Sequence, residues 1–236
     1  MKCPMGFDHA PSRTTDLDFA DDGAVLFRGA LGRDRVHALE RALAGLPPDQ
    51  AGIRLHGIGA LVPFLSAKGP VGRLAVSVLG NKCHPVRAIL FDKSATTNWS
   101  LPWHQDRTIA VKQRREVCGF GPWSIKSGML HVEPPFAVLA GMATLRVHID
   151  AVSATNAPLL IAPGSHRLGR IPENKIPEVV KRCGIVPCQA QIGDIWVYAT
   201  PILHASAAAA EPSRRRVLQV DFAACPLPGG LEWLGV

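Results

Sequence analysis

The chain has no long hydrophobic run, and this lack argues against a membrane-spanning helix. Its apolar tract at residues 136–145 is interrupted by Gly141 and Thr144 and ends at Arg146, whereas about 20 apolar residues are needed to cross a bilayer. Acidic and polar residues follow the first six, where a secretory signal would carry an apolar segment. We therefore expect no membrane partner and no secretory signal.

Paired cysteines of the zinc-binding kind are also lacking. The 236 residues include six cysteines, and none forms a Cys-x-x-Cys pair. Cys183 and Cys188 stand close together, but no second pair at suitable spacing accompanies them, so a structural zinc site is disfavoured. A chain of this length does not need disulfides to hold its core. Scattered cysteines therefore indicate a reducing, cytoplasmic location.

Aromatic residues are few, at 6%, although 26 basic against 19 acidic residues give a net charge of +7. A basic chain can bind nucleic acid, but here the charge is dispersed apart from Arg214, Arg215 and Arg216, and no helix-turn-helix, RNP or finger pattern occurs. An anionic small molecule accounts for the same bias. We expect a small-molecule substrate of anionic character and no nucleic-acid partner, with the oligomeric state left open.

Hydrophobic periodicity predicts two helices before residue 80 and short strands afterwards. Apolar residues recur at helical spacing in residues 32–43 and 71–79, and we expect the first helix to end at Gly45, before Pro47 and Pro48. Strands are expected within residues 22–29, 86–91, 103–110, 143–150, 158–162, 192–198 and 216–222.

Short strands without alternating long helices predict an α+β, mainly β fold. We expect a double-stranded β-helix (jelly-roll or cupin-like) core with flanking helices. It would form one domain over residues 1–236, with residues 1–15 as a flexible N-terminus. A segment rich in glycine, residues 112–129, is expected to be either a lid over the site or a plain connection.

The sequence Trp103-His104-Gln105-Asp106 indicates a metal site. A His and a carboxylate two residues apart on an extended segment point to the same side of the backbone. His204, far along the chain, would supply a second imidazole. Two neutral nitrogens and one anionic oxygen on one face, with the opposite positions open, suit non-haem Fe(II) that must also bind a co-substrate and O₂.

A carboxylate-binding group is expected beside this metal site. Ser206 lies two residues after His204 and hence on the same face of its strand, and the Arg214–Arg216 run leads into an apolar strand. A hydroxyl beside a guanidinium binds a carboxylate well, because the planar fork of Arg bonds both oxygens. The alternation of side chains does not separate Arg214 from Arg216. In the strand before them, Thr144, Arg146 and His148 share one face, which is either solvent-exposed or inside a barrel.

An ordered set of motifs resembles the phytanoyl-CoA dioxygenase family of Fe(II)/2-oxoglutarate-dependent oxygenases. The resemblance covers about residues 17–222. The motifs are residues 87–93, Trp103-His104-Gln105-Asp106, residues 127–135, Pro163-Gly164-Ser165-His166-Arg167, Gly193-Asp194, and His204-Ala205-Ser206 through Arg215.

The resemblance implies roles for particular residues. His104, Asp106 and His204 would bind Fe(II), and Arg215 and Ser206 would bind the distal carboxylate of 2-oxoglutarate, with Arg214 and Arg216 as rivals of Arg215. Further co-substrate contacts would come from Thr144, Arg87 and Lys93. Candidate substrate contacts are Arg146, His131 and Met129.

The resemblance also implies the reaction. With O₂, the enzyme would convert 2-oxoglutarate to succinate and CO₂ and hydroxylate an unactivated C–H bond of a small molecule, such as an amino-acid derivative or a biosynthetic intermediate. Related halogenases lack the carboxylate ligand, so Asp106 favours hydroxylation over halogenation. Desaturation, cyclisation or demethylation on the same scaffold remains an alternative, as does a cupin-type hydrolase, isomerase or binding protein. Asn156-Ala157-Pro158 departs from the family's Asn-Gly-Pro, which leaves the shape of that turn open.

Overall fold

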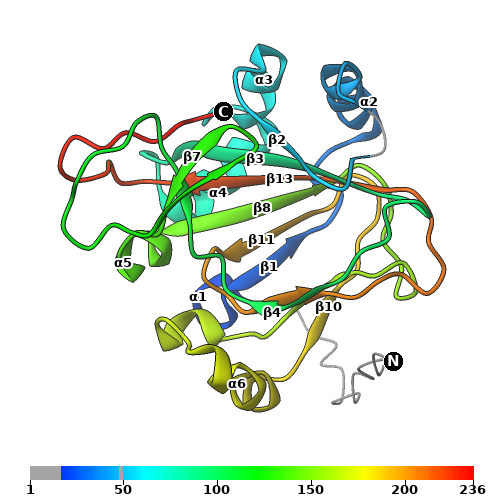
Figure 1. The fold of residues 1–236 in the computed structure, drawn as a ribbon. Helices are drawn as coiled ribbons and strands as arrows, with labels where there is room; N and C mark the ends of the chain where they lie inside the picture. Colours follow the sequence, from blue (N-terminus) through cyan, green and yellow to red (C-terminus); the bar gives the residue numbers. More distant parts are fainter. Residues whose placement is uncertain (1–16, 48–49) are drawn as a thin grey trace.

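The computed structural model describes residues 17–47 and 50–236, so the expected flexible segment at residues 1–15 lies outside the described residues. Two antiparallel sheets face each other and form a jelly roll, as expected (Figure 1). No helix in the described ranges is both long enough and apolar enough to cross a membrane.

The larger sheet has six strands in the order β1-β11-β8-β13-β3-β2. Its longest pairing joins β13 to β3, from Arg215 opposite Lys93 to Ala223 opposite His84. The strands are β1 Ala24–Phe27, β2 Ile53–Leu55, β3 His84–Lys93, β8 Met142–His148, β11 Ile195–Ala199 and β13 Arg215–Ala223.

The opposing sheet has four short strands in the order β10-β9-β12-β4, and a third sheet has the order β5-β7-β6. The strands of the four-stranded sheet are β4 Leu101–His104, β9 Leu159–Ile161, β10 Val186–Cys188 and β12 His204–Ser206. Those of the three-stranded sheet are β5 Ile109–Ala110, β6 Trp123–Lys126 and β7 Met129–Val132.

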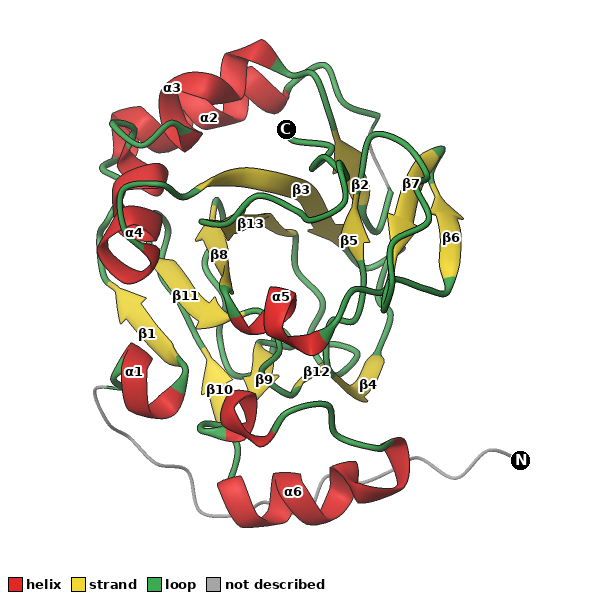
Figure 2. Ribbon diagram, turned by 90° about the vertical axis from the view of Figure 1, so that its left-hand side faces the viewer, coloured by secondary structure: helices red, strands yellow, loops and turns green. Residues whose placement is uncertain are grey.

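Helices cover the outer faces of the two main sheets (Figure 2). The apolar side of α2, with Val36, Leu39 and Leu43, packs in one cluster with the outward residues of the six-stranded sheet, as the 3.6-residue period requires. Helix α6 packs against Leu203, the residue before β12 of the four-stranded sheet. The helices are α1 Phe19–Asp22, α2 Arg33–Leu43, α3 Val62–Leu65, α4 Pro70–Leu79, α5 Phe136–Ala140 and α6 Ile176–Cys183, with 3₁₀ turns η1 Gly59–Leu61, η2 Ser165–Leu168 and η3 Glu173–Lys175.

The polar stripe of β8 points into the barrel. Leu145 and Val147 join the apolar cluster under the helices, whereas Thr144, Arg146 and His148 are buried on the opposite face of the strand. Because the helices already cover the outside, the polar side chains line the interior between the sheets. The alternative of a solvent-exposed stripe is therefore excluded.

Three expectations about chain segments need correction. Residues 103–110 do not form one strand, because Gln105 bonds Pro201 O (2.8 Å) and Ile171 N (2.9 Å) and the chain crosses from β4 to β5 of another sheet. Residues 112–129 are not one loop, because β6 and β7 form a hairpin whose turn residues Ser127 and Gly128 have φ of 51° and 75°. The first helix ends at Leu43 rather than Gly45.

The altered Asn-Ala-Pro turn keeps a conformation that suits glycine. Ala157 has φ of 47°, in the left-handed region that L-residues other than glycine seldom adopt. Its carbonyl accepts a hydrogen bond from Arg215 Nη1. The turn therefore helps to hold the buried side chain of Arg215.

Gly72 allows α4 to approach the chain after α3, so we expect Gly72→Ala to destabilise the fold. A Cβ there would lie 1.9 Å from Ser66 O. We expect a loss of about 1–3 kcal/mol in the free energy of unfolding, measured by denaturant titration. Ser77→Ala, at an exposed position of the same helix, should change stability by less than about 0.5 kcal/mol. A stabilised Gly72→Ala variant, as helix propensity alone predicts, would refute the close contact.

Candidate metal centre

His104, Asp106 and His204 come together at one point of the barrel. His104 ends β4 and lies opposite His204, the first residue of β12, in the antiparallel register. One ligand atom from each of the three residues lies within 4.8 Å of those of the other two. The triad therefore has the donor set and the spacing that suit Fe(II).

Each histidine of the triad is oriented by a backbone carbonyl two residues earlier in the chain. His104 Nδ1 lies 2.8 Å from Pro102 O, and His204 Nδ1 lies 2.9 Å from Ile202 O. A carbonyl only accepts, so Nδ1 carries the proton and Nε2 keeps its lone pair for a metal ion. Burial and the neighbouring His104 lower the pKa of His204 to about 4. The neutral, metal-binding form of His204 is thus the stable one at neutral pH.

Asp106 is held as a carboxylate by Arg87. Arg87 Nη2 lies 3.0 Å from Asp106 Oδ2, and Arg87 Nε bonds Asp221 on β13. Burial alone would raise the pKa of Asp106, but the Arg87 charge keeps it below the usual value. Thr144 donates to Asp221 Oδ1 at 2.9 Å. Arg87 and Thr144 thus bond to Asp221 in a buried network that ends at Asp106 of the triad.

Beyond the triad, the barrel interior contains three buried cationic side chains. Lys93, Arg146 and Arg215 have exposed fractions of 4, 6 and 4%, and among residues 17–47 and 50–236 none of them pairs with a carboxylate. Lys93 Nζ lies 3.1 Å from Ser206 Oγ, and Arg146 Nη1 lies 2.8 Å from Gln219 Oε1. Buried cations without counter-ions are costly, so this region is suited to an anion.

The pKa values report the same crowding of positive charge. Burial, reinforced by Arg215 and Arg146, lowers the pKa of Lys93 to about 7. Burial and Arg146 lower that of Arg215 to about 9, and burial lowers that of His148 to about 3. Within the described chain, Nε of Arg146 and of Arg215 and both ring nitrogens of His148 have no hydrogen-bond partner.

The register separates the three consecutive arginines. Arg215 points into the barrel opposite Lys93. Arg214 instead pairs with Asp92 at 3.1 Å, and Arg216 pairs with Asp150 and Glu40, each at 2.7 Å. Arg214 and Arg216 are therefore engaged outside the interior.

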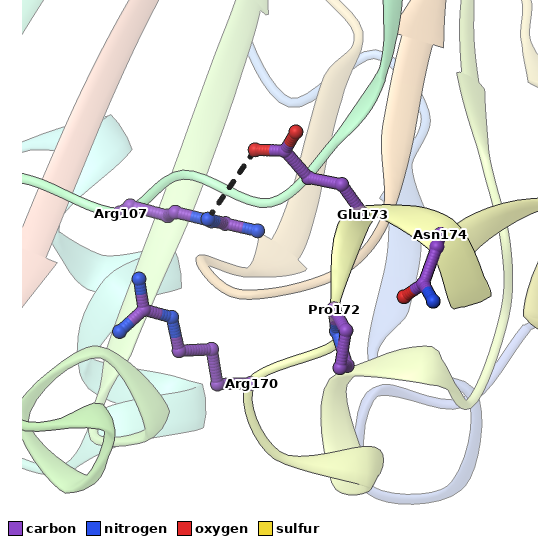
Figure 3. Close-up of a pocket in the computed structure, with 5 residues that line it drawn as sticks. All are labelled: Arg107, Arg170, Pro172, Glu173 and Asn174. Atoms are coloured by element: carbon purple, nitrogen blue, oxygen red, sulfur yellow. Dashed lines mark ion pairs between the residues drawn. The ribbon is translucent and has the colours of Figure 1, made fainter.

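Two hollows lead toward Asp106 from the surface. The outer one, of about 410 Å³, is lined by Arg107, Arg170, Pro172, Glu173 and Asn174 (Figure 3). The inner one, of about 140 Å³, shares both arginines and reaches Asp106. The triad therefore has an approach from solvent that ends at Asp106.

The remaining expected residues lie close by. His131 and Met129 are on β7, with His131 Nδ1 2.9 Å from Met129 O. Reasoning from sequence missed Asp221, because one acidic residue in an apolar strand gives no sign of its partner. It also missed Gln219, two residues earlier on the same strand face. The pattern Gln219-x-Asp221 within an apolar strand was the available signal.

Comparisons with solved structures show the fold. EctD from S. alaskensis in its apoform aligns with a TM-score of 0.65 at 18% identity, covering 97% of this chain and 84% of that chain. SnoN, an α-ketoglutarate-dependent epimerase from nogalamycin biosynthesis, gives 0.62 at 16%, covering 92% and 83%. HygX from Streptomyces hygroscopicus with nickel and 2-oxoglutarate bound gives 0.59 at 13%, covering 87% and 84%.

No curated protein matches the sequence. The phytanoyl-CoA dioxygenase family matches residues 19–217. This range is most of the chain and includes all three residues of the triad. This match confirms the resemblance that the sequence motifs indicated. The chain belongs to the phytanoyl-CoA dioxygenase family.

Proposed function

We propose that the protein is an Fe(II)/2-oxoglutarate-dependent oxygenase that hydroxylates a small molecule. The observation that carries this proposal is the triad of His104, Asp106 and His204, with ligand atoms within 4.8 Å, beside a buried cationic pocket. A cupin-type hydrolase or binding protein would need the metal ligands but not the buried cations next to them. We further propose that residues 1–236 form one catalytic domain and that the protein is located in the reducing cytoplasm.

The residues present fit iron. Two imidazole Nε2 atoms and the Asp106 carboxylate would hold Fe(II) on one face and leave positions for 2-oxoglutarate and O₂. When bound, the metal supplies O₂ activation coupled to the decarboxylation of 2-oxoglutarate to succinate and CO₂. Arg87 keeps Asp106 ionised, and the backbone carbonyls of Pro102 and Ile202 keep both imidazoles in the required tautomer.

The distal carboxylate of 2-oxoglutarate would bind between Arg215, Lys93 and Ser206. Arg215 supplies a planar fork for both oxygens, and Ser206 already bonds Lys93 at 3.1 Å. Arg146 adds positive charge on the same side of the barrel. Arg87 and Thr144 would act through Asp221 and Asp106 rather than on the co-substrate, since both bond Asp221.

Hydroxylation is favoured over halogenation because Asp106 retains the carboxylate ligand. Desaturation, cyclisation or demethylation would use the same residues, and SnoN is described as an epimerase. The substrate would be a small molecule, as for HygX, which has a structure with hygromycin B bound. Product mass after turnover under ¹⁸O₂ distinguishes these outcomes, because only hydroxylation adds one labelled oxygen to the retained skeleton.

We expect His104→Ala, Asp106→Ala and His204→Ala each to abolish 2-oxoglutarate consumption. Changes around a metal site, one step removed from the metal, already cost about 10–100-fold in affinity, so loss of a ligand should exceed 100-fold. Anaerobic titration with Fe(II) and then 2-oxoglutarate measures the loss of metal binding through the visible charge-transfer band of the chelate, and an assay in air measures the consumption of 2-oxoglutarate. His37→Ala, at an exposed surface position, should keep the band. A full band in any triad variant would contradict the assignment.

Arg215→Gln should weaken 2-oxoglutarate binding by about 10–100-fold, since it removes a charge-assisted bidentate pair. Arg214→Gln should leave the affinity unchanged, because Arg214 is exposed and pairs with Asp92. The same titration gives both dissociation constants. Equal affinities in wild type and Arg215→Gln would assign the carboxylate to other residues.

The affinity for 2-oxoglutarate should fall as pH rises above about 7. The free protein has a Lys93 pKa of about 7, and a bound carboxylate raises it, so binding takes up a proton. Affinity is then constant below pH 7 and falls by up to about tenfold per unit between the free and bound pKa values. Lys93→Met should remove this slope, whereas Lys112→Met, at a surface ion pair, should keep it. An unchanged slope in Lys93→Met would exclude Lys93 as its source.

A further inference from the structure

A group of cations lies on the side of Asp106 formed by the β6–β7 hairpin and β2. Lys126, at the end of β6, donates to Thr108 Oγ1 at 2.8 Å. Thr108 also accepts, through its carbonyl, from Arg87 Nη1 at 3.4 Å. The Lys126 ammonium therefore lies beside the guanidinium that holds the metal ligand Asp106.

Arg54 of β2 completes this group. Its Nη1 lies 3.4 Å from Ser127 Oγ in the hairpin turn, next to Lys126. Burial and the charge on Arg87 lower the pKa of Arg54, and burial with Arg87 and Arg54 lowers that of Lys126. These shifts show that the cations repel one another across a partly buried space.

Neither Arg54 nor Lys126 has an acidic partner of its own in the part of the chain that the structure describes. Each bonds only a neutral hydroxyl, and the Nε of Arg54 is buried with no partner. Asp106 is the nearby carboxylate, but Arg87 already bonds it. A metal ion bound to Asp106 would neutralise part of the carboxylate charge. Asp106 would then compensate the positive charges of Arg54 and Lys126 even less.

His131 places an unpartnered acceptor on the same face, because its Nδ1–H donates to Met129 O and Nε2 keeps its lone pair. In the β6–β7 register Lys126 lies opposite Met129 and Ser124 opposite His131, so these four side chains share one side of the hairpin. His131 is fully buried, and its Nε2 has no hydrogen-bond partner among the described residues. Its pKa is lowered by burial and by Lys126, Arg87 and Arg54, which places it beside this group.

We propose that Arg54 and Lys126 bind an anionic group of the substrate, beside the acceptor nitrogen of His131, and so place its reacting carbon at the metal. This inference rests on the proposed function and gives it a substrate class, molecules that carry a carboxylate or a phosphate. Both anions accept several charge-assisted hydrogen bonds at once. Arg54 and Lys126 come from β2 and β6 and bond Ser127 and Thr108, whereas the cations of the co-substrate pocket come from β3, β8 and β13.

The test measures where small anions bind relative to the metal. Protein loaded with Mn(II) and saturated with 2-oxoglutarate is mixed with methyl phosphate or acetate, and the paramagnetic relaxation of ³¹P or of the acetate methyl protons is compared with that in Zn(II)-loaded protein. We expect enhanced relaxation for at least one anion. Enhancement by acetate alone indicates a carboxylate substrate, and by methyl phosphate alone a phosphate ester.

Arg54→Gln and Lys126→Gln should each weaken this binding by about 10-fold, the usual effect of one charge-assisted hydrogen bond. Glutamine keeps a donor toward Ser127 or Thr108. Lys126→Arg should bind like wild type, as should Lys112→Gln, whose lysine pairs with Glu232 at the surface. Anion binding that is absent, or equal in the wild type and both glutamine variants, overturns the inference.

The charge-transfer band with Fe(II) and 2-oxoglutarate separates the two proposals. Its presence in both glutamine variants shows that they are folded and that the co-substrate site is intact. Its absence from the wild-type protein overturns the proposed function itself.

Discussion

The double ion pair of Arg87 is the interaction on which the site depends. One guanidinium joins Asp106, on the segment between β4 and β5, to Asp221 of β13. Its side chain is only 10% exposed, so losing Arg87 would leave two neighbouring carboxylates without their counter-charge in a poorly solvated place, at a cost of about 3–5 kcal/mol. The six-stranded sheet thereby fixes the position of a carboxylate that belongs to a loop.

Around that link, charge divides the barrel into three zones. Lys93, Arg146 and Arg215 make one end positive, the triad supplies neutral nitrogens and one anion, and Arg54 and Lys126 form a second positive zone beyond Asp106. Apolar residues under α2 and α4 cover the outer face of the sheet and supply the burial that supports this polar interior. One alternating strand such as β8 serves both purposes, with Leu145 outward and Arg146 inward.

Local pattern predicted the jelly roll and the shared side of His104 and Asp106, because both depend on alternation and on short-range spacing, whereas the place of His204 beside them was implied by the family's order of motifs. Local pattern did not separate the three arginines, because folding alone brings their partners Asp92 and Asp150 beside β13. Arg54 and Lys126 are far apart in sequence and meet only when the β6–β7 hairpin reaches β2. Residues 103–110 resembled one strand because Gln105, which takes the chain out of the sheet, leaves no trace in hydrophobic pattern.

The carbonyls that orient His104 and His204 belong to residues two positions earlier in the chain. The backbone therefore sets the direction of both imidazoles, and the proposed iron site would have little means of rejecting another divalent ion of similar size. Divalent nickel, cobalt and copper bind such nitrogen and oxygen sites more strongly than ferrous iron. The ion bound at the proposed site would then depend on the metals supplied during synthesis and purification, so recombinant preparations would need iron reconstitution before inactivity is interpreted.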